Sequence, residues 1–391
     1  MFTRFFPFLS WIKDLQNPSV LKKDIIAWLS VSFILIPQSM AYAQLAWLPI
    51  EVGLYTAFIP VMIAAMFGSS PQMSTGPITI VSLMTATALA PIATTGTSWY
   101  IAYASLLAMF IWFIYLLIGC LRMWVIVDFL SHPVIIWFTN AAAILTITSQ
   151  LWKIFWVSPE KSDNYISNLY LLFSSIVAQT HIATLVCWFA SIFFLIYFWK
   201  LFPKLPKVLF LLVFSIIFSY LIWYYNTYGW ATVWNIPGQL PFISFDFLYT
   251  SIWSASFRDI LRLFIFAVII GLIGFTQSIS VAKYVSYATK KPLSPNRELI
   301  GQWLANITSS LFWWYWVAWS LSKTAVNLRA WAKTWLTSVV TGSMVGITLL
   351  FFTPVLSYLP VATLAAIIIL AVINMIRFSP VSYTHLRAHE T

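Results

Sequence analysis

The chain has 391 residues, of which 61% are hydrophobic and 8% are charged. Soluble domains carry about 25% charged residues, so this composition excludes a soluble globular domain, a disordered chain and a small disulfide-stabilised secreted domain. The net charge of +11 comes from basic residues spread between apolar segments. It therefore does not indicate nucleic acid as a partner. The sequence predicts a polytopic membrane protein whose surroundings are the lipid bilayer.

Apolar segments that can cross a bilayer as helices recur along the whole chain, since one span needs about 20 residues. In chain order they are 24–46, 50–66, 99–119, 124–151, 181–199, 206–225, 259–282, 299–312, 334–353 and 361–376. We predict that segment 165–180 is a helix lying along the membrane interface.

Two shorter segments, 76–90 and 320–330, follow turn-rich stretches and are too short or too polar to span alone. Short, interrupted segments at corresponding places in two halves indicate the transport site of inverted-repeat carriers. Gly76 and Pro77 suit the first turn of a helix, where neighbouring N–H groups stay free. Two such helix N-termini meeting in the membrane would form an anion site, because each offers unpaired donors and partial positive charge. The alternative is a pair of ordinary capped helices.

Basic residues give the orientation. If 76–90 is the third span and 320–330 the tenth, every basic cluster falls on one side. By the positive-inside rule this predicts a multi-pass protein of the cell (inner, cytoplasmic) membrane with a cytoplasmic N-terminus. The clusters contain Lys13, Lys22, Lys23, Arg122, Lys200, Lys204, Lys207, Lys283, Lys290, Lys291, Arg297, Arg329 and Lys333.

Several blocks, in order, resemble the sulfate permease (SulP) family of anion transporters over nearly the whole chain. These blocks are 36–43, 53–55, 67–70, 74–77, 278–283 and 320–327. The resemblance implies an all-α membrane fold of two inverted repeats of seven helices, divided into a core and a gate domain. It also implies a homodimer, with an anion held between half-helices 3 and 10, which face each other.

On this basis we expect five regions. They are a cytoplasmic N-terminal segment 1–23, a first repeat 24–225, an extracytoplasmic loop 226–257, an incomplete second repeat 258–380 and a terminal segment 381–391. The terminal segment resembles one reading frame of a sequencing-library adapter, and we exclude it from the fold. The resemblance also implies further spans and a cytosolic STAS domain that this chain does not contain.

The family's site, carried over to this sequence, places an anion beside side chains of the first span and the starts of both half-helices. The expected binding residues are Gln38, Tyr42, Gly76, Pro77, Ile78, Ser320, Ser322 and Lys323. An amide and a phenol can donate hydrogen bonds, and Lys323 supplies a whole charge. Two alternatives remain open: Tyr42 only packs, or Lys323 extends towards the cytoplasm.

Gln277 departs from the family pattern, because many bacterial members have a carboxylate at this place in the eighth span. A carboxylate could carry a proton or bind sodium. The neutral amide of glutamine binds protons and sodium much more weakly. The sequence therefore weakens the case for proton or sodium coupling and favours anion exchange or facilitated movement.

The chain contains 22 Trp and 12 Gly, an unusual ratio. An aromatic belt gathers Trp at membrane interfaces, but Trp112, Trp137 and Trp188 lie inside apolar runs. Against the family pattern, many Trp stand where glycine is expected. We hypothesise that most are glycines, written as Trp because UGA codons were translated with the wrong code. Trp11 is an expected exception.

The sequence thus predicts a secondary active transporter of small inorganic anions of the sulfate, bicarbonate or chloride class, working by an elevator-type movement. The alternatives are an anion channel or uncoupled facilitator on the same fold, a small dicarboxylate carrier, or an intramembrane enzyme. No span contains clustered nucleophiles, metal ligands or paired acids, so we expect no enzyme, no metal and no cofactor.

Overall fold

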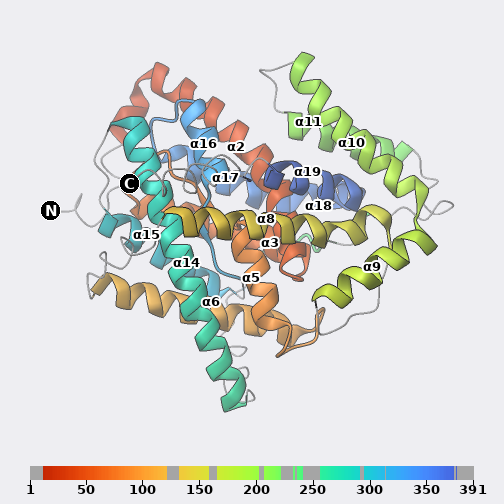
Figure 1. Ribbon diagram of the computed structural model, residues 1–391. Helices are drawn as coiled ribbons and strands as arrows, with labels where there is room; N and C mark the ends of the chain where they lie inside the picture. The colour runs from red at the N-terminus through yellow and green to blue at the C-terminus, as the bar shows by residue number, and fades with distance from the viewer. Residues whose placement is uncertain are drawn as a thin grey trace, which may run out of the picture. The chain divides into compact units, whose positions relative to one another are not determined.

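The computed structural model describes residues 12–120, 132–157, 165–201, 207–221, 232–233, 236–240, 256–290, 295–312, 314–373 and 376. Arg122, Lys204, Lys291, most of the predicted loop 226–257 and the segment 381–391 lie outside these residues. The described part is helical apart from two short strands and isolated turns (Figure 1).

The chain divides into two compact units, and each takes residues from both halves of the sequence. The first unit comprises Met1–Ser131 and Gly238–Phe351, and the second comprises His132–Pro237 and Phe352–Thr391. This division cuts across the two predicted repeats, as expected for a core and a gate domain. The repeat boundaries at 225 and 258 themselves stay a prediction.

The first unit contains nine helices with two strands between them, among the described residues. Its elements are α2 (Pro18–Leu45), α3 (Ile50–Thr56), α4 (Ile59–Phe67), β1 (Thr75–Gly76), α5 (Thr79–Leu89), α6 (Ser98–Cys120), α14 (Phe257–Thr289), α15 (Pro295–Leu311), β2 (Ala318–Trp319), α16 (Leu321–Arg329) and α17 (Leu336–Ile347). A 3-10 turn, η2 (Ile12–Gln16), precedes α2, and a π turn, η3 (Thr348–Phe352), follows α17.

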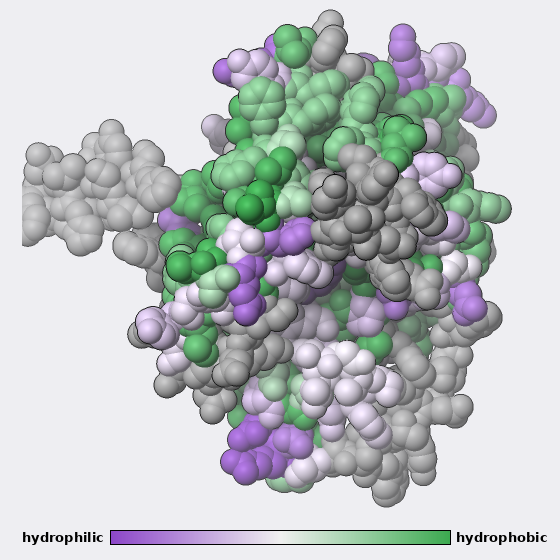
Figure 2. All heavy atoms as spheres, turned by 90° about the vertical axis from the view of Figure 1, so that its right-hand side faces the viewer, coloured by the Kyte–Doolittle hydropathy of each residue, from purple (hydrophilic) through white to green (hydrophobic). Residues whose placement is uncertain are grey.

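The second unit contains α8 (His132–Phe155), α9 (Tyr165–Gln179), α10 (Ile182–Leu201), α11 (Lys207–Leu221), α18 (Thr353–Leu356) and α19 (Val361–Ile373). Helix α19 packs against α8, α10 and α11. Phe189, Phe193, Phe214 and Phe218 on α10 and α11 are more than half exposed. Figure 2 shows that apolar side chains cover much of the surface seen in that view. Such side chains are suited to contact with lipid.

Five stretches of the described residues are long and apolar enough to cross a membrane. They are Pro18–Leu45, Ile50–Phe67, Ser98–Gly119, Phe257–Thr289 and Leu336–Leu356. A sixth is possible if Leu169–Gln179 and Ile182–Phe198, whose axes differ by 107°, form one broken span. The fold is thus the predicted all-α membrane fold, and its helices coincide closely with the predicted segments.

One predicted span is interrupted. Segment 50–66 forms two helices, α3 and α4, with Ala57 and Phe58 between them. Pro60 stands in the first turn of α4. Proline has no N–H to donate to the preceding turn but suits a helix start, so the chain begins a second helix there.

Candidate functional site

The two short strands bring the starts of the two predicted half-helices together. Strands β1 and β2 pair antiparallel, with Thr75 opposite Trp319 and Gly76 opposite Ala318. The pairing continues where the backbone N–H of Ser320 donates to the carbonyl of Ser74 at 2.9 Å. Each strand leads within a few residues into a helix, α5 or α16. Two helix N-termini, each with partial positive charge, therefore begin beside one another.

The two helix starts differ in how they are capped. Ile78 is the N-cap residue of α5, and no side chain caps that helix. Ser320 is the N-cap residue of α16, and its hydroxyl accepts a 3.4 Å hydrogen bond from the backbone N–H of Lys323. Ser320 thus caps the start of α16. The first-turn N–H groups of α5 have no side-chain acceptor and are suited to binding an anion.

Lys323 lies in the protein interior, with 1% of its surface exposed. Its side-chain nitrogen donates to the carbonyl oxygen of Pro77 at 3.1 Å. The interpretation that this side chain extends towards the cytoplasm is therefore wrong. A buried ammonium is costly unless it has partners of opposite charge or polarity. Its place between the two helix starts makes it the strongest source of positive charge among the described residues of this region.

Gly76 allows this close approach. Its φ angle is +149°, and a Cβ atom there would lie 2.6 Å from the Lys323 nitrogen. No side chain could be added without moving the ammonium or the strand. The Gly-Pro pair that the sequence singled out thus serves two purposes: Gly76 makes room for the cation and Pro77 supplies its hydrogen-bond acceptor.

Gln38 and Tyr42 lie one turn apart on α2, which packs against both α5 and α16. Both are buried, with 6% and 4% of their surfaces exposed. The Tyr42 side chain lies near Thr79, the first residue of α5. The Gln38 side-chain oxygen has no hydrogen-bond partner. Tyr42 thus lies at the start of the half-helix, and its role in binding stays a prediction.

Ser322 and Gln277 flank this group. Ser322 is exposed, and its hydroxyl oxygen lies 3.1 Å from that of Ser320. Gln277 lies on α14, which packs against α5, β2 and α16. Its side-chain oxygen, like the hydroxyl of the adjacent Ser278, is buried without a hydrogen-bond partner. Hydrogen bonds join Pro77, Ser320, Ser322 and Lys323 to one another, whereas Gln38 and Tyr42 lie on α2 and Gln277 on α14.

Sequence reasoning missed the side chains that hold the strands in place. The Thr324 hydroxyl accepts a 3.1 Å hydrogen bond from the backbone N–H of Ser74. On α15, the side chain of Asn306 both donates to and accepts from the backbone of Val317, at 3.1 and 2.8 Å, and Gln302 donates to the same carbonyl. Asn306 thus fixes the backbone just before β2. Polar residues spaced four apart on an apolar helix were the available signal for Gln302.

Two buried carboxylates hold the loops around the half-helices. One oxygen of Glu298 accepts hydrogen bonds from the backbone N–H and hydroxyl of Ser69, at 2.7 and 2.6 Å, and from the backbone N–H of Ser70 at 2.8 Å. Asp24 accepts from the backbone N–H groups of Lys333 and Thr334, at 2.7 and 3.3 Å. The sequence suggested that Asp24 sits near a span end, but α2 begins earlier and buries it fully.

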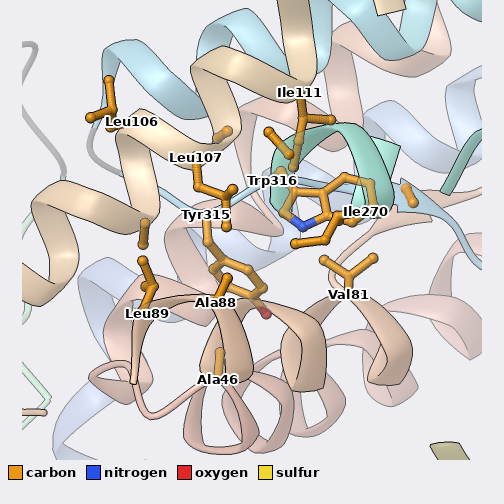
Figure 3. Packing of buried hydrophobic residues seen from close by; sticks show 14 of the residues in the cluster. Ala46, Val81, Ala88, Leu89, Leu106, Leu107, Ile111, Ile270, Tyr315 and Trp316 are labelled. Atoms are coloured by element: carbon orange, nitrogen blue, oxygen red, sulfur yellow. The ribbon is translucent and has the colours of Figure 1, made fainter. Parts of the chain in front are cut away.

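Aromatic side chains fill the space behind the strands. Tyr315 and Trp316 are buried, and Figure 3 shows both among Val81, Ile270 and other apolar residues. Trp319, which the sequence places at the entrance of the half-helix, is a member of β2. This part of the chain therefore packs with indole rings close to the site, as its composition implied.

Comparison with known proteins places these features in context. The sulfate permease family model matches residues 21–387. The chain is 33% identical over 384 residues to "Sulfate transporter 4.1, chloroplastic" of Arabidopsis thaliana, covering 95% of this chain and 54% of that protein. The chain thus spans about half the length of this curated relative.

Two solved structures share the fold. One is the murine Solute Carrier 26 family member A9 anion transporter in the inward-facing state, with a TM-score of 0.86 at 22% identity, covering 98% of this chain and 65% of that one. The other is the transmembrane domain of the cyanobacterial bicarbonate transporter BicA, with a TM-score of 0.81 at 19% identity, covering 93% and 91%. At these identities the likeness shows the fold alone.

Proposed function

This chain belongs to the sulfate permease family, and we propose that it is a secondary active transporter of small inorganic anions of the sulfate, bicarbonate or chloride class. One observation carries the proposal. The ammonium of Lys323 is buried between the starts of two paired half-helices, where it donates to the carbonyl of Pro77. Positive charge without a counter-charge in a membrane protein is expected where an anion binds.

The proposed anion lies between the N-termini of α5 and α16. Main-chain N–H groups near Gly76, Pro77 and Ile78 would donate from one side, and Lys323 with Ser322 from the other. Gln38 and Tyr42 add an amide and a phenol from α2. Such donors recognise charge and size more than chemical identity. These donors support an anion as the substrate.

The mechanism we propose is an elevator-type movement. All of the proposed binding residues belong to the first unit. Ser74 joins the two half-helices, because its backbone N–H donates to the Thr324 hydroxyl and its carbonyl accepts from the N–H of Ser320. A rigid site inside one compact unit can be carried as a body while it remains intact. We further propose a homodimer in the cell membrane with a cytoplasmic N-terminus, supported by the distribution of basic residues.

Gln277 favours exchange over coupling to protons or sodium, because its amide cannot carry a proton as a carboxylate would. The same observation keeps an uncoupled facilitator or anion channel on this fold as the alternative function. A small dicarboxylate carrier is a second alternative, since a carboxylate anion presents similar charge to the same donors.

Flux measurements on the full-length protein from the natural gene, reconstituted into liposomes, test the proposal. We expect uptake of labelled sulfate or bicarbonate that saturates and that rises when the vesicles contain a counter-anion. Protein-free liposomes are the control, and succinate as competitor tests the dicarboxylate alternative. Uptake that neither saturates nor responds to internal anion would overturn the proposal of a carrier and favour the anion channel.

A further inference from the structure

Four residues other than glycine adopt positive φ angles among the described residues, and three of them are tryptophan. The angles are 58° at Trp47, 54° at Trp156, 61° at Trp331 and 55° at Lys290. Tryptophan makes up 22/391, about 6%, of the chain. A bulky side chain in the left-handed region is an outlier, since its Cβ atom crowds the backbone, whereas glycine adopts it freely. Chance does not place tryptophan at three of four such positions.

The hydrogen bonds around Trp47 show what the backbone requires there. Helix α2 ends at Leu45, and Ala46 is its C-cap residue. The N–H of Leu48 then donates to the carbonyl of Ala43 at 2.9 Å, and that of Trp47 donates to Gln44 at 3.1 Å. These two bonds define a Schellman motif, the helix ending in which the residue after the C-cap is left-handed and is usually glycine.

The same ending recurs at the second half-helix. Helix α16 ends at Arg329, and Ala330 is its C-cap residue. The N–H of Ala332 donates to the carbonyl of Asn327 at 3.0 Å, and that of Trp331 donates to Leu328 at 3.1 Å. This turn directs the next residues to their partners, because the carbonyl of Ala332 accepts a 2.8 Å hydrogen bond from the Gln72 side chain. The shape of the motif thus sets how α16 connects to the loop that follows.

Trp156 ends α8 in the second unit by the same geometry. It directly follows the last helical residue, Phe155, and the N–H of Val157 donates to the carbonyl of Trp152 at 3.0 Å. Three helices in two separate units therefore have tryptophan where the same motif calls for glycine.

Packing does not explain these three tryptophans. Their side chains are 40%, 42% and 69% exposed at Trp47, Trp156 and Trp331. An interfacial aromatic belt would account for exposed rings at helix ends, but it does not require a left-handed backbone. Trp99 in the first turn of α6 is a suitable contrast, since it is 44% exposed and has no positive φ angle.

Buried tryptophans in the described residues give an independent observation. The indole nitrogens of Trp112, Trp188, Trp303, Trp314 and Trp316 are buried without a hydrogen-bond partner. Buried indole N–H groups usually have one. In addition, the Trp316 ring lies so close to Gly274 that a Cβ atom there would come within 2.5 Å of it. Several tryptophans thus fit their surroundings poorly, both in the protein interior and at the helix ends.

We infer that positions 47, 156 and 331 are glycine in the protein that the natural cells make, their codons being UGA decoded as glycine. The structure sharpens the compositional hypothesis from a general excess of tryptophan to three named positions. Each of them is one where only glycine relieves the backbone.

Peptide mass spectrometry of the protein purified from its natural membranes tests the inference directly. We expect glycine at positions 47, 156 and 331, and UGA at the matching codons of the gene. Tryptophan in these peptides, or UGG codons, would overturn it. Trypsin releases residues 330–333 as one short peptide, because Arg329 and Lys333 flank position 331.

Variants of the chain give a second, physical test. We expect Trp47→Gly, Trp156→Gly and Trp331→Gly each to raise the thermal unfolding midpoint in detergent by on the order of a few degrees. Trp47→Ala is the matched control, because it removes the ring but keeps a Cβ atom, and it should gain less. Trp99→Gly should bring no gain. If the parent chain does not fold, we compare instead how much monodisperse protein is recovered. The variant that combines Trp47→Gly, Trp156→Gly and Trp331→Gly should then give more of it than the parent. Equal results for glycine and alanine at position 47 would contradict the conformational argument.

Discussion

The side-chain nitrogen of Lys323 donates a 3.1 Å hydrogen bond to the carbonyl oxygen of Pro77, which lies 246 residues away in the sequence. The bond joins two half-helices that come from opposite halves of the chain. An ammonium offers three donors, and this bond uses one of them. Lys323 can therefore hold the two helix starts together and still present its charge to an anion.

Replacement of Lys323 by glutamine should weaken anion binding while the fold is kept. A hydrogen bond to a charged group contributes about 1.5–3 kcal/mol, so we expect the KM for sulfate to rise roughly 10- to 100-fold. Lys323→Arg should restore part of the affinity, because it keeps the charge. Concentration-dependent uptake into proteoliposomes measures the effect.

Lys333→Gln is the matched control for this prediction, since Lys333 is exposed and only its backbone N–H contacts Asp24. It should leave the KM unchanged. A Lys323→Gln protein that takes up sulfate with the parent KM would show that this charge does not serve the anion.

Gly76→Ala should abolish transport, because a Cβ atom would lie 2.6 Å from the Lys323 nitrogen and the φ angle of +149° disfavours alanine. Gly96→Ala is a suitable control. Its φ angle is also positive, at +83°, but a Cβ atom there would meet nothing within 4 Å. We expect Gly96→Ala to transport normally with a small loss of stability. Similar transport by both variants would mean that the contact with Lys323 is irrelevant.

Much of the architecture was predictable because each span is a continuous apolar run. The start of α16 was also predictable, since Ser320 is a residue type that caps helices. The predicted start of the first half-helix was wrong by three residues, because Gly76 lies in β1 and α5 begins at Thr79. These signals lie within a few residues of the structure they specify. The break between α3 and α4 was missed, although Pro60 marks it, because the run around it is uniformly apolar.

The contacts between distant residues were not predictable in this way. Nothing near Glu298 in the sequence shows that Ser69 and Ser70 will donate to it, and Asp24 meets Thr334 only after the fold has formed. A single acidic residue in an apolar sequence suggests the end of a membrane span, whereas the structure buries both Asp24 and Glu298. Pairings of this kind depend on how helices pack, which one sequence does not specify.

Glu298 should be needed for stability more than for anion affinity. Its single accepting oxygen serves three donors from Ser69 and Ser70. Glu298→Ala leaves these donors without a partner and should cost about 1–3 kcal/mol for each donor that stays buried. Glu298→Gln keeps an oxygen in place and should cost less, about 1–2 kcal/mol.

Thermal unfolding of the two Glu298 variants in detergent measures these losses. Glu51→Gln serves as a control, because the Glu51 side chain is only half-buried at the start of α3. It should unfold near the parent temperature. A Glu298→Ala protein as stable as the Glu51→Gln protein would contradict the role of this carboxylate in holding the 69–70 turn.

Gln277 should determine whether transport responds to a cation gradient. Its side-chain oxygen is buried without a hydrogen-bond partner on α14, beside α5 and α16. A carboxylate at the same position could take up a proton or bind sodium close to the anion. We therefore expect sulfate uptake by the parent to ignore imposed proton and sodium gradients. Uptake by Gln277→Glu should rise several-fold with an inward gradient of one of them.

Ser280→Glu is the matched control for this substitution, because Ser280 lies nearly one turn further along α14 and is exposed. A carboxylate at this exposed position should leave uptake insensitive to either gradient, because it does not face the half-helix starts. Uptake by the parent that already rises with a proton or sodium gradient would place coupling elsewhere in the chain. Gradient responses that are equal for Gln277→Glu and Ser280→Glu would show that position 277 has no special access to the bound anion.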